Sequence, residues 1–196
     1  MNYAIIGTGN VGKALAQRFA GSGAAVTIAN TRGPDSLAAL ARELGPAVIA
    51  GSRQDALAAD IIILVVPFAA HQAVARCRAD WRGKSVIDAM NFREPGLAPL
   101  GGFQSSDFVA QSLPGAKVVK TFNQMPAALL ASDPLESGGR RVMFVAGNHD
   151  DANAEVASLV FPLGFSAFTL GRMAEGGSLL RFRGPLVLHN FIKLGN

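Results

Sequence analysis

The chain has 196 residues, a length that suits one domain, or one domain with a small appendage, and argues against two full domains. Hydrophobic residues make up 49% of it and charged residues only 16%, and this apolar excess predicts a subunit interface. The net charge of +4 comes from scattered basic residues, which argues against nucleic-acid binding and is compatible with anionic small molecules.

The sequence also argues against a membrane-spanning, a disulfide-bonded or a metal-binding protein. No apolar run reaches the roughly 18 residues of a membrane span, and the N-terminus lacks the pattern of a secretory signal. We therefore expect a cytoplasmic protein without membrane contact. A single cysteine, Cys77, excludes an internal disulfide, and the three histidines lie far apart without ligand spacing. We assign no metal site.

The N-terminal half alternates strands with helices. The apolar run at residues 61–66 has no polar break, which is typical of a parallel strand buried on both faces. This rhythm predicts an α/β fold with a Rossmann-type, doubly wound and mostly parallel sheet. Strands are expected at residues 3–6, 25–29, 47–50, 61–66 and 85–89, with helices from residue 11 to the glycines near 21, and at 35–44, 53–59 and 70–79.

Beyond residue 91 the rhythm loosens. We expect helices at 103–112 and 151–161, strands at 117–122, 141–146 and 166–169, and a final amphipathic helix at 184–194. A soft boundary near Gln124 divides an NADP-binding Rossmann domain, residues 1–124, from a small C-terminal α/β extension, residues 125–196. The extension is too short for a large core of its own, so we expect it to serve substrate binding or dimerisation.

Residues 7–12 read Gly-Thr-Gly-Asn-Val-Gly, a G-x-G-x-x-G pattern between a predicted strand and a predicted helix. In a dinucleotide-binding turn, Gly7 permits the tight turn, Gly9 lets the backbone approach a pyrophosphate, and Gly12 lets helix and strand pack closely. The N–H groups at the helix start face the anion. We therefore predict cofactor contacts along the segment, from Gly7, Thr8, Gly9, Asn10, Val11 and Gly12.

The end of the second predicted strand distinguishes NAD from NADP. Proteins that bind NAD carry Asp or Glu there, whereas this chain carries Asn30, followed by Thr31 and Arg32. An amide, a hydroxyl and a guanidinium form a donor-rich pocket for a 2′-phosphate, and no carboxylate repels it. We predict NADP(H) as the cofactor. The alternative is that residues 30–34 form an ordinary solvated turn.

Two further segments end strands at the same edge, where open α/β sheets bind ligands. Val66, Pro67 and Phe68 close the central strand, and we predict that they contact the cofactor together with His71. Core packing is the alternative for Phe68, and an exposed helix position is the alternative for His71. After the strand at 117–122, a flat ring would suit the amides and apolar groups of the next segment, and core packing is the alternative for Met125. We predict that this segment binds the substrate, through Asn123, Gln124, Met125, Pro126 and Ala127.

No catalytic residue can be assigned. The chain shows no Tyr-x-x-x-Lys, Cys-His or Ser-His-Asp arrangement, and its only tyrosine, Tyr3, lies in the first strand. Direct hydride transfer needs positioning more than a proton donor, because the cofactor supplies the chemistry.

Together these segments resemble the NADPH-dependent coenzyme F420 reductases and the related cytosolic domains of the STEAP metalloreductases. The match covers nearly the whole chain and is more specific in its N-terminal half. It comprises residues 4–13, 31–32, 65–68, 86–89 with Asn91, 122–127, 184–186 and 194–195.

The resemblance implies that NADP(H) lies across residues 7–12 with its 2′-phosphate at Thr31-Arg32, and we include Asn91 among the cofactor contacts. It also implies that the nicotinamide lies near residues 125–127, that a deazaflavin stacks beside it, and that the C-terminal elements of a homodimer help to form the pocket. The chain departs from the archaeal deazaflavin enzymes at Asn123-Gln124, where they carry His-Thr.

The resulting hypothesis is an NADP(H)-dependent oxidoreductase, similar to F420H2:NADP+ oxidoreductases, that passes a hydride between NADP(H) and a deazaflavin (coenzyme F420) or a flavin-like acceptor. A carbonyl or imine reductase of the 6-phosphogluconate dehydrogenase-like group is a second possibility, but that class needs a longer helical C-terminal domain. Outside enzymology, the alternative is an NADPH-binding redox sensor without turnover. Arg181 and Arg183 are candidates for contacting the acidic tail of a deazaflavin, or form a solvated basic face.

Overall fold

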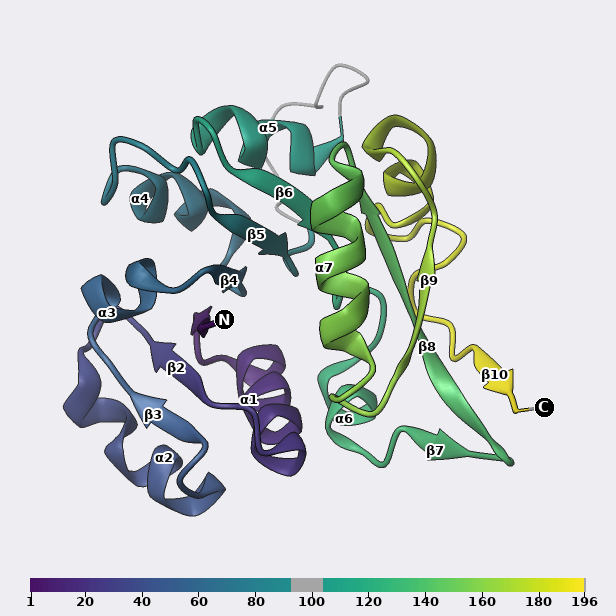
Figure 1. Cartoon of the computed structure of the whole chain (residues 1–196), viewed down its shortest axis with the longest axis horizontal. Coiled ribbons are helices and arrows are strands. Elements are labelled where there is room, and N and C mark those ends of the chain that lie inside the picture. The colour runs from purple at the N-terminus through teal and green to yellow at the C-terminus, as the bar shows by residue number, and fades with distance from the viewer. Residues whose placement is uncertain (93–103, 196) are drawn as a thin grey trace.

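The computed structural model describes residues 1–92 and 104–195. Its N-terminal half is a parallel sheet with the strand order β3-β2-β1-β4-β5-β6, so the chain starts in the middle and winds outwards in both directions (Figure 1). These strands are β1 (Tyr3–Ile6), β2 (Val26–Ala29), β3 (Val48–Ala50), β4 (Ile61–Leu64), β5 (Ser85–Asp88) and β6 (Lys117–Lys120).

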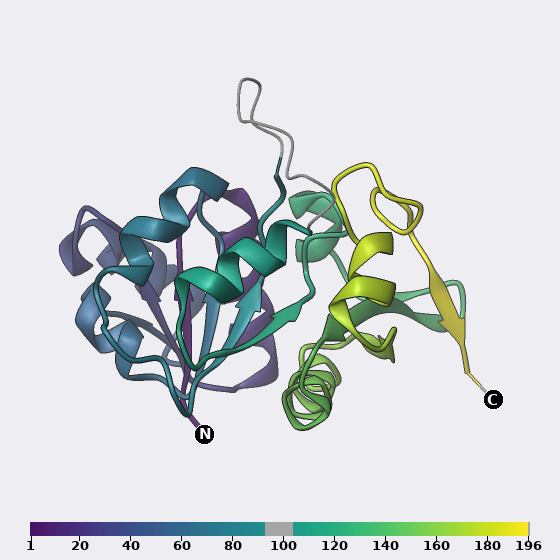
Figure 2. The same ribbon diagram turned by 90° about the horizontal axis from the view of Figure 1, so that it is seen from above.

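Helices cover both faces of this sheet (Figure 2), which explains why its central strands are apolar throughout. Alternate residues of one strand point to opposite faces: Ile5 and Ile63 join the core under α1, whereas Ile6 and Leu64 join the core under α3, α4 and α5. The helices are α1 (Asn10–Ser22), α2 (Ala38–Leu44), α3 (Arg53–Ala58), α4 (His71–Ala75) and α5 (Ser105–Ser112), with short 3₁₀ turns η1 (Pro34–Leu37) and η2 (Phe68–Ala70).

The C-terminal part continues the same sheet. The long strand β8 (Gly139–Gly147) pairs antiparallel with β6, and its other partners are β7 (Leu135–Glu136), β9 (Ser166–Thr169) and β10 (Ile192–Leu194). Two helices, α6 (Ala127–Ala131) and α7 (Asp150–Val160), and a π-helical turn η3 (Met173–Gly177) complete it.

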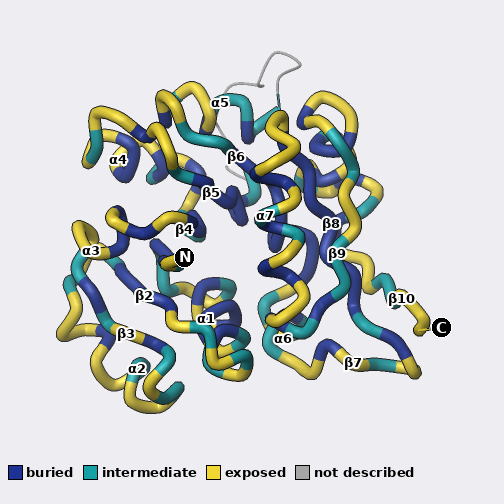
Figure 3. Tube along the Cα trace, viewed as in Figure 1, coloured by how far each residue is buried: buried dark blue, intermediate teal, exposed yellow. Residues whose placement is uncertain are grey.

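The predicted fold class is confirmed: the structure is a Rossmann-type α/β fold with a mostly parallel sheet and a small C-terminal extension. Figure 3 shows the buried strands running through its centre. The division into residues 1–124 and 125–196 stays a prediction, and the two parts share one hydrophobic cluster, in which Val156 of α7 belongs with Ile5 of β1.

The predicted helix at residues 184–194 is wrong. These residues form turns that lead into β10, and Leu188 has a φ of 68°, which a right-handed helix excludes. Tertiary hydrogen bonds hold the segment open: the Val142 N–H donates to the Phe191 carbonyl at 2.8 Å, and the Leu188 N–H to the Gln124 carbonyl at 2.6 Å. Residue 103, expected to start a helix, lies outside the described residues.

In the described parts of the chain, no helix combines the length and the apolar character of a membrane span. The same parts hold no group of three or more His, Cys, Asp or Glu side chains placed to bind a metal ion.

Candidate functional site

Two of the three glycines in residues 7–12 lie too close to neighbouring backbone to carry a side chain, and the third faces open space. Gly7 has a φ of 108°, and a Cβ there would lie 2.1 Å from the Val65 carbonyl oxygen. A Cβ at Gly12 would lie 1.9 Å from the Gly7 carbonyl oxygen. A Cβ at Gly9, the residue that precedes α1, would meet nothing within 4 Å. The predicted tight turn and close helix packing are thus confirmed, and Gly9 leaves its backbone open to a ligand.

Two cavities flank Gly9 at the carboxyl edge of the sheet, and both are also lined by Val65, Val66 and Pro67. We call them the β2-side cavity, of about 420 Å³, and the β5-side cavity, of about 510 Å³. The β2-side cavity is further lined by Ile6, Gly7, Thr8, Asn30, Thr31, Arg32, Arg53, Ala70, Ala73 and Val74. The β5-side cavity is further lined by Asn10, Val11, Phe68, Ala89, Met90 and Asn91.

This arrangement brings together most residues that the sequence analysis assigned to a cofactor. Of those residues, all but Gly12 and His71 line one of the two cavities. Gly12 packs beneath the turn instead. Arg53, which the sequence analysis treated only as a helix start, is an addition to the lining. A nucleotide laid across Gly9 would have one half in each cavity, and the contacts themselves stay a prediction.

Asn30 orders the turn after β2 rather than offering free donors. Its side-chain amide donates to Thr8 Oγ1 at 3.3 Å and to Ser36 Oγ at 3.1 Å, and its Oδ1 accepts the Arg32 N–H at 2.8 Å. Because these bonds fix the backbone at Arg32, they position its side chain beside the cavity. Of the three side chains predicted to bind a phosphate, the Thr31 hydroxyl and the Arg32 guanidinium therefore remain available as donors.

His71 lies away from both cavities. It is 2% exposed, and its ring nitrogens contact the Phe68 carbonyl oxygen at 2.5 Å and Ser112 Oγ at 3.2 Å. The ring therefore connects η2 to α5 behind the cavity wall. His71 is not at an exposed helix position, which was the alternative, and it does not line either cavity. Phe68 is 7% exposed and packs in the core, as its alternative predicted, and it also lines the β5-side cavity. Its contact with a cofactor stays a prediction.

A buried ion pair supports the floor of the β5-side cavity. Lys120 Nζ lies 3.1 Å from Asp88 Oδ2, with the two side chains 3% and 0% exposed. The lysine also donates to the Met90 carbonyl, and Asp88 accepts the Met90 N–H at 2.9 Å and the Ser106 hydroxyl at 2.6 Å. Both polar groups of the Met90 backbone are thus held by charged side chains, which fixes the segment that carries Asn91.

The segment predicted to bind substrate, residues 123–127, contributes no lining residue to either cavity. Asn123 reaches the site indirectly: its amide donates to Asn91 Oδ1 at 2.9 Å, and Asn91 donates back to the Asn123 carbonyl at 3.0 Å. Gln124 is fully buried and engages β8, donating to the Val142 carbonyl at 2.9 Å and accepting the Phe144 N–H at 2.8 Å. Its side chain therefore joins the segment that follows β6 to β8.

The remaining three residues of that segment differ in exposure. Met125 is buried, Ala127 is half-buried, and Pro126 is exposed at the start of α6. The residue before the segment, Phe122, is fully buried with a φ of 60°, a conformation rare for a bulky side chain. The contact of residues 123–127 with substrate stays a prediction. The contact of Arg181 and Arg183 with the acidic tail of a deazaflavin also stays a prediction.

Comparison with known proteins identifies the family. A family model described as NADP oxidoreductase, coenzyme F420-dependent, matches residues 2–92. The crystal structure of a proposed F420-dependent NADP reductase from Arthrobacter sp. FB24 is 32% identical, with a TM-score of 0.75, and the match covers 92% of this chain and 90% of that one. The chain belongs to the F420-dependent NADP oxidoreductase family.

Two further relatives are similar over most of this chain. A hypothetical protein from Sinorhizobium meliloti is 45% identical, with a TM-score of 0.93, over 98% of this chain and 96% of that one. The metalloreductase STEAP3 of Rattus norvegicus is 28% identical over 173 residues, which are 87% of this chain and 34% of the relative. The chain thus spans about a third of the length of that curated relative. Both predicted resemblances are confirmed, and the chain is thus a member of a family of NADP-dependent oxidoreductases.

Proposed function

We propose that this F420-dependent NADP oxidoreductase family member passes a hydride between NADP(H) and the flat ring of coenzyme F420, a deazaflavin, or of a flavin. The observation that supports this proposal most is the lining of the β5-side cavity. It consists of backbone, apolar side chains and the amides of Asn10 and Asn91, with no titratable side chain among its described residues. Reducing a carbonyl calls for a proton donor beside the substrate, whereas transfer from ring to ring calls mainly for alignment.

The polar groups around Gly9 suit a nucleotide at three points. The open backbone at Gly9 and the first N–H groups of α1 would hold the pyrophosphate. Thr31 and Arg32 would hold the 2′-phosphate in the β2-side cavity. Asn91, fixed by Asn123, would hold the nicotinamide end in the β5-side cavity. The bound nucleotide would supply the hydride, and the apolar walls would exclude water from it.

The test is rapid mixing of NADPH-loaded protein with oxidised F420, FMN or FAD in separate experiments. We expect the nicotinamide absorbance to disappear with one of these acceptors, and to persist when buffer replaces the acceptor. Tight NADPH binding with no oxidation by any of the three would contradict the proposal and favour an NADPH-binding redox sensor instead.

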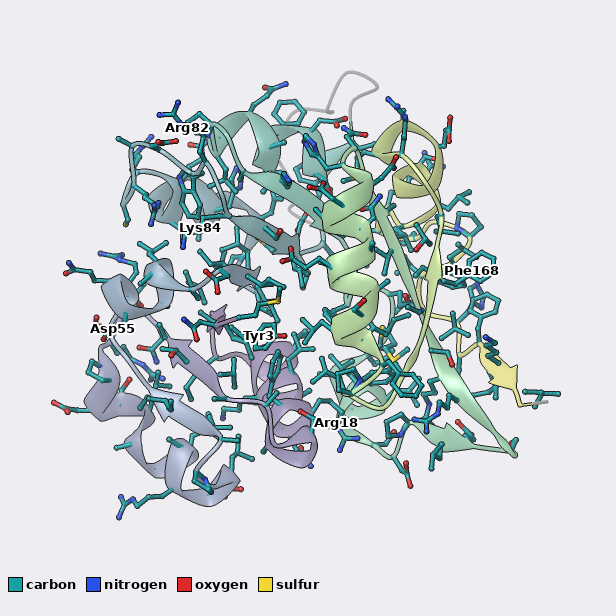
Figure 4. All side chains as sticks on the ribbon, viewed as in Figure 1. Tyr3, Arg18, Asp55, Arg82, Lys84 and Phe168 are labelled. Carbon is teal, nitrogen blue, oxygen red and sulfur yellow. The ribbon has the colours of Figure 1, made fainter. Side chains whose placement is uncertain are left out.

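We also propose that the protein is a cytoplasmic homodimer. Support for the dimer comes from large apolar side chains that stay exposed in the C-terminal part, among them Phe161, Phe168 and Leu188, which are 61%, 58% and 59% exposed. Figure 4 shows Phe168 on the outer side of β9, away from the parallel sheet. Analytical ultracentrifugation should give twice the chain mass, and a purely monomeric species would contradict the dimer.

A further inference from the structure

The β2-side cavity is lined by two guanidinium groups and by no carboxylate among its described residues. Arg32 follows β2, and Arg53 is the first residue of α3. Both side chains are exposed, and neither guanidinium has a hydrogen bond or ion pair within the parts of the chain that the structure describes. Two cations that face one hollow without a counter-charge favour an anionic ligand there.

The sheet itself brings these two arginines together. The strands β2 and β3 are parallel neighbours, with Ile28 beside Ala50. The chain then stays against β2, because the Gly51 N–H donates to the Ile28 carbonyl at 3.0 Å. A Cβ at Gly51 would lie 2.5 Å from Thr27 Cγ2, so this close approach needs glycine. The start of α3 is thereby held next to the turn that carries Arg32.

The nearest acidic side chain on α3 is engaged elsewhere. Asp55 accepts the Ser52 N–H at 2.8 Å and the Ser52 hydroxyl at 2.7 Å, and its own N–H donates to Ser52 Oγ at 3.1 Å. These bonds from Ser52 keep the pKa of Asp55 below its ordinary value, so the carboxylate stays ionised in this capping box. Positions two apart on a helix do not face each other, and Arg53 remains unpaired beside it.

We infer that Arg53 and Arg32 together bind the 2′-phosphate of NADP(H), and that Arg53 is a residue that determines specificity for NADP(H) over NAD(H). The inference rests on the proposed nucleotide binding. A phosphate monoester offers three acceptor oxygens and close to two negative charges, enough for two guanidinium groups, whereas NAD(H) has a single hydroxyl at the same position. Two arginines reaching the phosphate from neighbouring loops would hold it more selectively than Arg32 alone.

The test uses the full chain and separates the adenosine half from the rest of the nucleotide. Calorimetry would measure the binding of NADPH, NADH, adenosine 2′,5′-bisphosphate and 5′-AMP to wild type, Arg53→Ala, Arg53→Lys and Arg32→Ala. Arg42→Ala is the matched control, since Arg42 is an exposed arginine on α2 outside the cavity lining. Circular dichroism would verify that the exposed substitutions leave the fold unchanged.

We expect Arg53→Ala to weaken NADPH and the bisphosphate by about tenfold or more, and NADH and 5′-AMP by less than about twofold. Arg53→Lys should lie between Arg53→Ala and wild type, because a lysine retains the charge and loses the fork geometry. Two results would contradict the inference and leave the proposed function in place, provided that wild type binds NADPH. Arg53→Ala could bind NADPH as tightly as Arg42→Ala does, or it could lose as much affinity for NADH as for NADPH. If wild type binds neither dinucleotide, both fail.

Discussion

Alanine at Gly9 should impair nucleotide binding and leave the fold almost unchanged, whereas alanine at Gly12 should destabilise the fold itself. The two glycines lie in the same turn and differ in their surroundings. Gly9 has a φ of −71°, which alanine adopts readily, and its Cβ would meet nothing within 4 Å. The Cβ of an alanine at Gly12 would lie 1.9 Å from a backbone carbonyl oxygen, so the helix or the turn must move.

The expected magnitudes follow from these surroundings. At Gly9, the weaker N-cap preference of alanine is roughly offset by the lower entropy of the unfolded chain, so stability should change by less than about 1 kcal/mol. At Gly12, overpacking should cost about 1–3 kcal/mol, which lowers Tm by roughly 2–12 °C in a chain of this size. A methyl group in the path of the pyrophosphate should weaken NADPH binding by about tenfold or more, a loss of about 1.4 kcal/mol.

Thermal unfolding with and without NADPH distinguishes the two effects. Gly9→Ala should retain the Tm of the free protein and lose several degrees of the NADPH-induced increase, because ligand stabilisation depends on the concentration relative to Kd. Gly21→Ala is the control, since Gly21 lies near the other end of α1 and its Cβ, like that of Gly9, would meet nothing within 4 Å. An NADPH-induced increase equal to that of wild type in Gly9→Ala would refute the placement of the pyrophosphate.

Three further predictions concern charged groups. Arg32→Ala should weaken NADPH binding by about 1.5–3 kcal/mol and barely affect NADH, and calorimetry showing equal losses would contradict this. Lys120→Met should cost about 3–5 kcal/mol in chemical denaturation because it leaves Asp88 charged and unpaired in the core, and adding Asp88→Asn should restore part of that loss. A hydrogen bond from Asn190 and the charge of the Arg141 guanidinium lower the pKa of Glu136. The stability that Glu136 contributes is therefore present above its ordinary pKa of about 4.3 and is lost as the pH falls below that value. Glu136→Gln should flatten the dependence of Tm on pH in this range, and a profile equal to that of wild type would contradict the predicted role of these contacts.

The sequence predicted well wherever the physical cause was local. The turn at Gly7 follows from neighbouring residues, because a strand must reverse into a helix within a few positions. The alternation of strands and helices likewise predicted the doubly wound sheet. Local reasoning failed for residues 184–194, whose apolar spacing is helical but whose backbone bonds go to Val142 and Gln124. Hydrogen bonds to residues far away in the sequence determined the backbone there, and the helical spacing of the apolar residues did not.

The candidate site shows the same limit. Thr31 and Arg32 could be identified because they directly follow a predicted strand, but Arg53 reaches the same cavity only through the pairing of β2 with β3. Two amides were misleading for a related reason. The side-chain N–H groups of Asn30 donate to Thr8 and Ser36, and the side-chain amide of Gln124 donates to β8. Neither amide is therefore free to donate to a ligand, although the residue type alone suggested that it would be.

The shared hydrophobic cluster of α1, the parallel sheet and α7 has a consequence for how the molecule comes apart. Truncation after Gln124 would strip Val156 and Leu159 away from the core that they form with Phe19 and Ile5. The N-terminal fragment would then expose a wide apolar face of its sheet to water and aggregate. Heating the whole chain should melt both parts in a single cooperative transition, so damage to the C-terminal strands should also weaken the proposed nucleotide binding.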